Sequence, residues 1–307
     1  MASWAIVSTM KAPEEKVLAF VAHHLSLGAD HLWLFFDDPA QPIPQPLQDH
    51  PRVTVTLCDE AHWIRVLQRR PPQHQNRQTH NARFAYREQV ASDWIAHIDV
   101  DEFILPARPV SAILDDTPTD TIAMKMEPFE AMHDPLLPDD IYTSREFRGA
   151  LRHEHWPRRR AALGVYRKVI RDGMLSHTVG KVIYRTGVAN LLPRLHAVMI
   201  DKVFVPTPTW QPEMKLLHFH SQDRAAWEAA LPFRMTRGAY QFRPELQAFL
   251  AEATPEAIDK FYRRTQMMSV DLRDELVQVG RVIIADLGLR AKVRALTEGG
   301  LGQDRGR

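Results

Sequence analysis

The segment HIDVDEF, residues 97–103, contains the acidic pair with the clearest chemical meaning in this sequence. Asp99 and Asp101 are separated by one residue, so at the end of an extended strand both side chains point to the same side. Carboxylates this close repel each other unless a cation lies between them. Such oxygen ligands favour Mg²⁺ or Mn²⁺, which often share their remaining positions with phosphate oxygens. The pair therefore predicts a cation and phosphate site; the alternative is an acidic turn that caps the next segment.

The segment HFH, residues 218–220, brings two imidazoles close together in sequence. We expect a strand over residues 216–220, which would place His218 and His220 on the same face. Imidazole is a competent ligand for Mn²⁺. Two residues on one face of a strand lie roughly 6.5 Å apart, so only one of them readily completes a single-ion site with the acidic pair. The alternative is a structural histidine pair in an apolar strand.

Buried strands are predicted where apolar and β-branched residues run together, at residues 5–9, 31–36, 53–57 and 94–98. Helices are expected between them, from Pro13 to Gly28 and over residues 81–92. This alternation predicts an α/β fold with a largely parallel sheet flanked by helices. Ligands bind such sheets at the carboxyl ends of the strands, and acidic residues follow two of the expected strands here.

The second half of the sequence has a looser pattern. Shorter strands are expected at residues 121–126, 165–170, 181–184 and 216–220. From residue 223 the chain is expected to be helical, with helices at residues 225–231, 244–252, 255–268 and 269–287. The last residues, GGLGQDRGR, are typical of a frayed tail. We expect one α/β domain with a helical C-terminal extension.

Composition excludes several classes of protein. The chain has 307 residues, of which 45% are hydrophobic and 25% charged, and its net charge of +1 argues against a nucleic-acid partner. The single cysteine, Cys58, excludes a disulfide framework and a multi-thiolate metal site. No apolar run reaches the ~18 residues needed to span a bilayer, and the start does not read as a secretory signal. We therefore expect a cytoplasmic protein.

Four stretches together resemble the GT-A-fold glycosyltransferases, in the family-2-like branch whose metal motif has the form D-x-D-E-F. They cover most of residues 5–240, and the motif D-V-D-E-F is the most specific part of the resemblance. The four stretches are VSTMKAPEEKVLAFVAHHLSLGADHLWLFFDD, QTHNARFAYREQVASDWIAHIDVDEF, IAMKMEPFEAMHD and LLHFHSQDRAAWEAALPFRMTRGAY. The resemblance implies a catalytic domain over residues 1–222, with a donor half to about 105 and an acceptor half over about 106–222, and a helical extension over 223–307.

The resemblance also implies roles for individual residues. Asp99 and Asp101 would bind the cation that bridges the diphosphate of a nucleotide sugar. His218 would be the third metal ligand because it precedes an aromatic residue, as in the family, with His220 as the alternative. The remaining donor-site residues implied are Asp37 or Asp38 at the nucleoside, Lys11 and Asn81 lining the pocket, and Arg237 at the diphosphate.

The acceptor side departs from the family pattern. The family carries a Phe-Gly-Ser-x-Gly segment where this chain has FEAMH, residues 129–133, without either glycine. Glu130 then lies where an inverting transferase would need a base, and Asp134 is a second candidate. The resemblance to the family-2-like branch implies inversion. The Asp-x-Asp motif alone does not decide between inversion and retention, because retaining transferases share the fold.

Charges are sorted along the chain. Residues 93–140 hold twelve acidic residues against two basic ones, and residues 143–185 hold eleven basic residues against three acidic ones. The basic stretch from Arg145 to Arg185 predicts a peripheral contact with an anionic acceptor or with the inner face of a membrane; the alternative is a solvated face. The expected partners are a nucleoside-diphosphate sugar and a glycan or other hydroxyl acceptor, as in the synthesis of surface polysaccharides or glycans.

Two other classes of protein fit part of the pattern. A haloacid-dehalogenase-like phosphatase also places Asp-x-Asp after a strand, with the first Asp as nucleophile. That class usually has the motif on its first strand and Thr or Val where this chain has Phe103. A non-catalytic binding module on the same fold is the other alternative, but it would have no reason to keep two repelling carboxylates. No Gly-x-Gly-x-x-Gly or P-loop motif occurs.

Overall fold

The computed structural model describes residues 1–88, 91–170, 172–207 and 209–301. The chain divides into two compact units, and each is assembled from stretches that are distant in sequence. Unit 1 consists of residues 1–127, 180–216 and 288–307, and unit 2 of residues 128–179 and 217–287. The domains expected from the sequence, residues 1–222 and 223–307, are each one continuous stretch.

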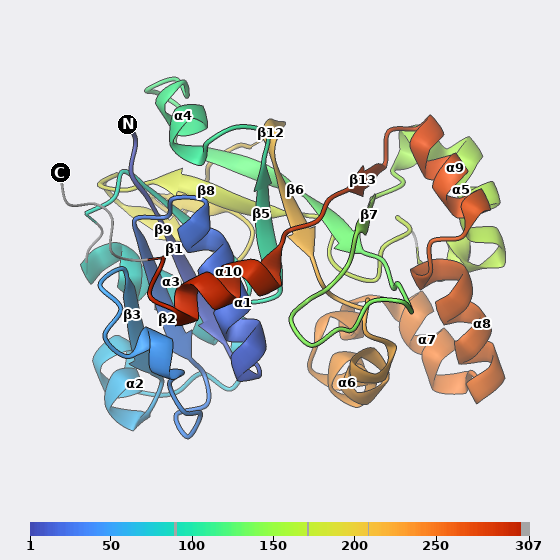
Figure 1. The fold of residues 1–307 in the computed structure, drawn as a ribbon, viewed down its shortest axis with the longest axis horizontal. Coiled ribbons are helices and arrows are strands. Elements are labelled where there is room, and N and C mark those ends of the chain that lie inside the picture. Colours follow the sequence, from blue (N-terminus) through green and yellow to red (C-terminus); the bar gives the residue numbers. More distant parts are fainter. Residues whose placement is uncertain (89–90, 171, 208, 302–307) are drawn as a thin grey trace. The chain divides into compact units, whose positions relative to one another are not determined.

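Unit 1 contains a sheet whose central strands are parallel, in the order β3-β2-β1-β4, and whose strands β8 and β6 continue antiparallel from β4 (Figure 1). Strand β12 pairs with β5 and β6. The strands are β1 Trp4–Met10, β2 His31–Phe36, β3 Val53–Leu57, β4 Trp94–His97, β5 Glu102–Pro106, β6 Ala123–Ala131, β8 Lys181–Arg185 and β12 Trp210–His218. Every residue of β1 is buried, as expected for a central strand covered on both faces. The predicted α/β class and largely parallel central sheet are confirmed.

The helices of unit 1 are α1 Glu14–Ser26, α2 Glu60–Leu67, α3 His74–Glu88, α4 Val110–Asp115 and α10 Leu289–Thr297, with a short 3-10 turn at Gln45–Leu47. Helix α1 follows Pro13 and has two glutamates in its first turn, where negative charge is favourable. All nine residues from Val17 to Leu25 are buried, because α10 packs against α1 although it lies near the other end of the chain (Figure 1).

Two buried histidines tie α1 to its neighbours within unit 1. His23 Nε2 donates to the Ile104 carbonyl at 2.8 Å, and Lys292 Nζ of α10 lies 3.1 Å from His23 Nδ1. His24 Nδ1 donates to the Phe20 carbonyl at 2.8 Å, and its Nε2 accepts from the Ile104 amide at 3.3 Å. Burial lowers the pKa of His24 to about 3, so both of its contacts belong to a neutral imidazole. The His-His pair is therefore part of the packing that supports β5.

A small antiparallel sheet completes unit 1. It consists of β9 Leu191–Pro193, β10 Val198–Ile200 and β11 Val203–Phe204. Leu191 and Val198 join the same buried core as Val7, Ile95 and Tyr184 of the large sheet. That core fixes the small sheet against α3.

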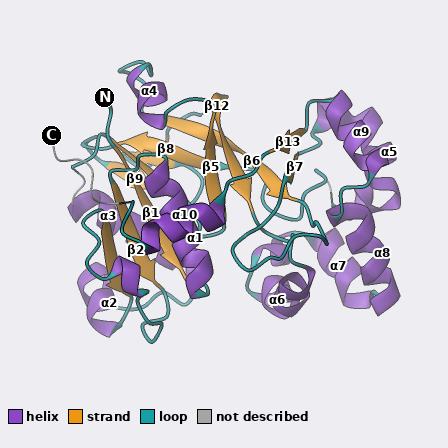
Figure 2. Cartoon of the chain, viewed as in Figure 1, coloured by secondary structure: helices purple, strands orange, loops and turns teal. Residues whose placement is uncertain are grey.

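Unit 2 combines a short antiparallel strand set with a group of helices (Figure 2). Strand β7 Glu146–Gly149 pairs with the end of β6 and with β13 Val282–Ile284. The helices are α5 Trp156–Leu163, α6 Arg224–Thr236, α7 Pro244–Glu252, α8 Pro255–Gln266 and α9 Val270–Gln278, with 3-10 turns at His153–His155, Gly164–Lys168 and Ala239–Phe242. Trp227, Tyr240, Phe261 and Tyr262 lie in the buried core that these helices share.

Several predicted elements were wrong or displaced. The strand expected at residues 165–170 is the 3-10 turn Gly164–Lys168, which begins at a glycine with φ of 57°. The long helix expected at 269–287 ends at Gln278, because Gly280 turns the chain with φ of 64° and β13 follows. Strand β12 ends at His218, so the strand expected to continue to 220 stops two residues earlier. The helix expected at 81–92 begins at His74; residues 89 and 90, and most of the expected frayed tail, lie outside the described residues.

Candidate functional site

The carboxyl ends of β1, β2 and β4 meet at one edge of the parallel strands in unit 1. Lys11 follows β1 directly, Asp37 and Asp38 follow β2, and Asp99 lies two residues after β4. The Asp37 amide donates to the Met10 carbonyl at 2.9 Å, which continues the pairing of β1 and β2 up to this edge. The sheet therefore brings together the polar residues that the sequence places after separate strands.

Two side chains hold the Asp99 carboxylate within unit 1. Gln78 of α3 donates to its Oδ1 at 2.5 Å, and Lys181 at the start of β8 donates to its Oδ2 at 2.8 Å. Glu102 accepts from the Asp99 amide at 2.8 Å and lies 3.5 Å from Lys181 Nζ. Both carboxylate oxygens of Asp99 are thus engaged by neighbours.

Lys181 has no exposed side-chain surface, and neither has Glu102. Burial alone would lower the pKa of Lys181, but the Asp99 and Glu102 carboxylates outweigh it, and the pKa lies above its ordinary value. Lys181 is therefore a buried ammonium ion. With Asp101 two residues after Asp99, this part of unit 1 holds three carboxylates and one ammonium, an excess of negative charge that favours a cation.

The acidic residues after β2 are occupied by basic partners. Arg77 donates two parallel hydrogen bonds to the Asp37 carboxylate, from Nε at 2.7 Å and from Nη2 at 2.6 Å. Arg70 donates a third hydrogen bond to the same carboxylate at 3.0 Å. Such forked contacts fix orientation as well as charge. Asp38 and Lys11 form an exposed ion pair at 2.9 Å, which lowers the pKa of Asp38 through its hydrogen bond to Lys11.

Asn81 lies beneath this edge with no exposed surface. Its amide nitrogen donates to the Thr9 hydroxyl at 3.0 Å, and its amide oxygen lies 2.8 Å from His62 Nε2. Both groups of the amide are committed to α2 and β1. Asn81 therefore supports the edge of the sheet from below rather than facing solvent.

Three histidines gather in unit 2. The rings of His177 and His218 lie 5.0 Å apart between centroids, and those of His218 and His220 lie 5.3 Å apart. His220 Nε2 lies 3.0 Å from the Tyr240 hydroxyl, which also accepts from Trp227 Nε1 at 3.0 Å. The pKa of His220 lies well below its ordinary value, mainly because the ring is buried and also because Arg234 is positively charged. This imidazole is therefore neutral and has a lone pair for a metal.

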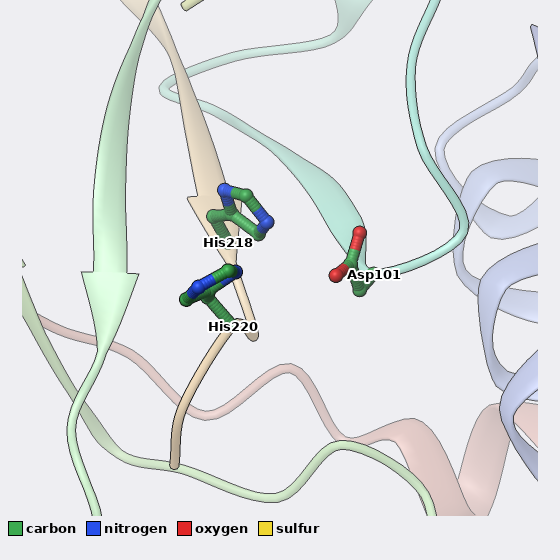
Figure 3. Close-up of side chains that lie close together, drawn as sticks. All are labelled: Asp101, His218 and His220. Carbon is green, nitrogen blue, oxygen red and sulfur yellow. The ribbon is translucent and has the colours of Figure 1, made fainter. Parts of the chain in front are cut away.

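Figure 3 shows the side chains of His218 and His220 close together in unit 2, and it also labels Asp101 of unit 1, which the sequence predicts as a metal ligand. A carboxylate combined with neutral imidazoles is a donor set that suits Mn²⁺ and also accommodates Mg²⁺ through water. The contact of His220 with Tyr240 resembles the outer hydrogen bond by which metal-binding histidines are usually oriented. The residues present therefore fit a divalent cation.

Glu130, expected as a base, is fully buried in unit 2. It forms an ion pair with Arg148 at 2.5 Å and accepts from the amides of Leu175 at 3.1 Å and Ser176 at 2.6 Å. Burial alone would raise the pKa of Glu130, but Arg148 and the two amides outweigh it, and the pKa lies below its ordinary value. A carboxylate so placed is stable as an anion and has no access to an acceptor hydroxyl in this structure.

The other expected residues lie in more open positions. Asp134 is partly exposed and accepts from the Leu136 amide at 2.9 Å, and Arg237 is exposed at the end of α6. The basic stretch from Arg145 to Arg185 is not one basic face, because Arg148 and Lys181 are fully buried. None of the helices that the structure describes is long and apolar enough to cross a bilayer.

Sequence reasoning missed the residues that support the site. Lys181 and Tyr240 lie far from their partners in sequence, and nothing in their local patterns marks them as buried partners of Asp99 and His220. Gln78 begins the second stretch that resembles the glycosyltransferases, three residues before Asn81. Its spacing of three residues from Asn81 on one helix is the signal that could have identified it.

Comparisons with known proteins add little. No family model matches this chain, and no curated protein sequence matches it. A crystal structure of TarS 1–349 from S. aureus is similar over 97% of this chain and 92% of that chain, with 11% sequence identity and a TM-score of 0.34. Similarity at that score does not carry a conclusion about function.

Proposed function

We propose that this chain is a metal-dependent glycosyltransferase that moves a sugar from a nucleoside-diphosphate sugar to a hydroxyl acceptor, with inversion. The observation that carries the proposal is the gathering of Lys11, Asp37, Asp38 and Asp99 at the carboxyl edge of parallel strands in unit 1. Nucleotides bind at this edge in open α/β sheets. The mixed sheet is compatible with a GT-A-like fold, and the D-V-D-E-F segment favours a sugar nucleotide.

The proposal includes a divalent cation, Mn²⁺ or Mg²⁺. We propose Asp101 and His218 as groups that would hold it, with His220 as the alternative or an additional ligand, since the resemblance implies these residues and carboxylate and imidazole form a suitable donor set. Asp99 contributes negative charge, but its oxygens are already engaged by Gln78 and Lys181. When bound, the ion would neutralise charge on the departing diphosphate.

The contact of His220 with Tyr240 supports its place in this set. If its Nε2–H donates to the Tyr240 hydroxyl, Nδ1 carries the lone pair that a metal requires. The Tyr240 oxygen already accepts from Trp227, which fixes the hydroxyl in the core of unit 2. Tyr240 therefore acts as a positioning residue for the proposed ligand.

The donor-binding roles follow from charge and exposure. Asp38 and Lys11 are exposed at the edge and are proposed to meet the nucleoside and the donor pocket wall. Asp37 is proposed to act by holding Arg77 and Arg70 in place, and Asn81 by supporting β1 and α2. Arg237 is proposed to contact the diphosphate, because a guanidinium stabilises charge that develops on it.

The acceptor hydroxyl must lose a proton as it attacks the anomeric carbon. Of the two expected bases, Glu130 is buried in an ion pair, whereas Asp134 is partly exposed. We therefore propose Asp134 as the base. Replacing Asp134 by Asn should lower transfer by on the order of 10²-fold while binding of the donor is unchanged.

A thermal-shift screen of UDP, GDP, CMP and TDP sugars, each with and without Mn²⁺, tests the function directly. We expect one nucleotide class to raise the melting temperature only when Mn²⁺ is present, because binding to the folded state stabilises it. Stabilisation by a nucleotide without any metal dependence would contradict the metal assignment. No stabilisation by any nucleotide sugar would contradict the function itself.

A further inference from the structure

Unit 1 has a pocket on the side of α3 that faces the small sheet. Its volume is about 450 Å³, within the range of small-molecule sites. Its walls come from the end of α2, from α3 and from the segment leading through β9. The residues that line it are Val66, Leu67, His80, Arg83, Tyr86, Arg87, Val188, Asn190, Leu191, Leu192 and Pro193.

Positive charge is concentrated at this pocket. His80, Arg83 and Arg87 are spaced by three and four residues, so they share one face of α3. Arg194 comes directly after β9, next to the lining residue Pro193. Arg83 Nε donates to the Pro193 carbonyl at 3.1 Å, which fixes its guanidinium between α3 and the small sheet.

No carboxylate balances these arginines among the residues that the structure describes. Burial has the largest effect on the pKa of His80 and lowers it. The positive charges of Arg83, Arg87 and Arg194 lower it further. The pKa of Arg83 is also lowered, mainly by burial and further by the positive charges of Arg194 and Arg87. The charges that act on both groups are all arginines. Asp201 lies near the rim, where Asn190 donates to it at 2.7 Å.

We propose that this pocket binds a phosphate monoester whose organic part is small and apolar. A phosphate monoester carries about −1.5 to −2 charge at pH 7 and three acceptor oxygens, which suits a pocket lined by Arg83 and Arg87 with Arg194 next to its lining residue Pro193. The apolar part would lie against Leu191, Leu192 and Pro193, while the phosphate relieves the repulsion between the arginines.

The pocket is separate from the proposed donor site. Gln78 and Asn81 point from α3 toward Asp99 and Thr9 at the sheet edge, whereas His80, Arg83 and Arg87 line the pocket. None of the proposed metal ligands lines it. Binding at this pocket should therefore be independent of Mn²⁺, so that its failure and the failure of the transferase proposal can be told apart.

Calorimetric titration of 1-naphthyl phosphate, with 1-naphthol and inorganic phosphate as comparison ligands and no metal present, tests the proposal. We expect 1-naphthyl phosphate to bind more tightly than either comparison ligand. The variant Arg87→Gln/Arg194→Gln should bind it at least about tenfold more weakly, since two charge-assisted contacts are lost. Both arginines are exposed, so the variant should keep its melting temperature.

Lys260→Gln/Arg294→Gln is the matched control, because Lys260 on α8 and Arg294 on α10 are exposed and their replacement also removes two positive charges, outside the pocket. Co-sedimentation with phosphatidylcholine vesicles, with and without phosphatidic acid, distinguishes a lipid headgroup from a free phosphate ester. Binding to either source that depends on Arg87 and Arg194 supports the proposal. Equal binding by the wild type and the double variant, or no binding to either source, overturns it.

Discussion

The ammonium group of Lys181 lies 2.8 Å from the Asp99 carboxylate and has no exposed surface. The same ammonium lies 3.5 Å from the buried Glu102 carboxylate. Lys181 therefore neutralises part of the acidic segment, and Asp99 is held in an ion pair before any ligand binds. This is why we assign the primary carboxylate ligand of the proposed cation to Asp101.

Replacing Lys181 by Met should destabilise the protein by about 3–5 kcal/mol, because Glu102 and Asp99 lose their buried counter-charge. Urea unfolding at neutral pH measures the change. Lys260→Met, at an exposed position on α8, is the matched control and should change stability by less than about 0.5 kcal/mol. A Lys181 variant as stable as the control would show that the buried pair contributes little.

Glu130→Gln separates the structural role seen here from the base expected from sequence. The structure predicts a loss of about 3–5 kcal/mol, since Arg148 would be left buried without its partner. If Glu130 were instead the catalytic base, the Glu130→Gln variant would be as stable as the wild type and only its transfer rate would fall. Urea unfolding of Glu130→Gln, compared with exposed Glu252→Gln on α7, decides between the two.

Stability should fall as the pH decreases from about 6.5 toward 4. Burial lowers the pKa of His24 to about 3 and that of His97 to about 4, so the unfolded chain takes up protons that the folded chain does not. Each such histidine contributes a slope of about 1.4 kcal/mol per pH unit in this window, and its contribution is fully present above pH 6.5. Urea unfolding across this pH range measures the slope, which should be shallower in His24→Asn. An unchanged slope in that variant would contradict the assignment.

His218, the last residue of β12, and His220 can be distinguished by metal affinity. His218→Ala should weaken Mn²⁺-supported nucleotide binding by the loss of one ligand, as the resemblance to the transferase family implies. If His220 is also a ligand, Tyr240→Phe should weaken Mn²⁺ binding about 10- to 100-fold, because the imidazole loses its orienting partner. Mn²⁺ titration of the two variants tests this. If neither of them changes Mn²⁺ affinity, the histidines do not hold the ion.

The sequence was sufficient to predict the helices and strands that have a continuous local signal, such as an unbroken apolar run or a proline at the start of a helix. Strands β2 and β3 have the predicted bounds, because unbroken runs of apolar or β-branched residues favour extended strands. Helix α7 also has the predicted bounds, with Pro244 in its first turn. The strand β13 could not be predicted, because Val282–Ile284 is extended only through its pairing with β7.

The candidate site was predictable only in part. Asp99 and Asp101 were visible because their spacing has a direct chemical meaning after a buried strand. The burial of Lys181 was not, since lysine is almost never fully buried without partners, and its partner Asp99 is 82 residues away. The burial of Glu130 depends in the same way on Arg148, which β7 brings to the neighbouring strand.

Titration of Mn²⁺ into the wild-type protein and into Asp101→Asn, by calorimetry in the presence and absence of UDP, tests the central claim most directly. Asp101→Asn should keep the fold, because it removes one of two neighbouring carboxylates that repel each other. Asp49→Asn, at an exposed position, is the matched control. The account predicts Mn²⁺ binding that is retained in the control and at least about tenfold weaker in Asp101→Asn. Equal Mn²⁺ affinity in Asp101→Asn and the wild type would contradict it.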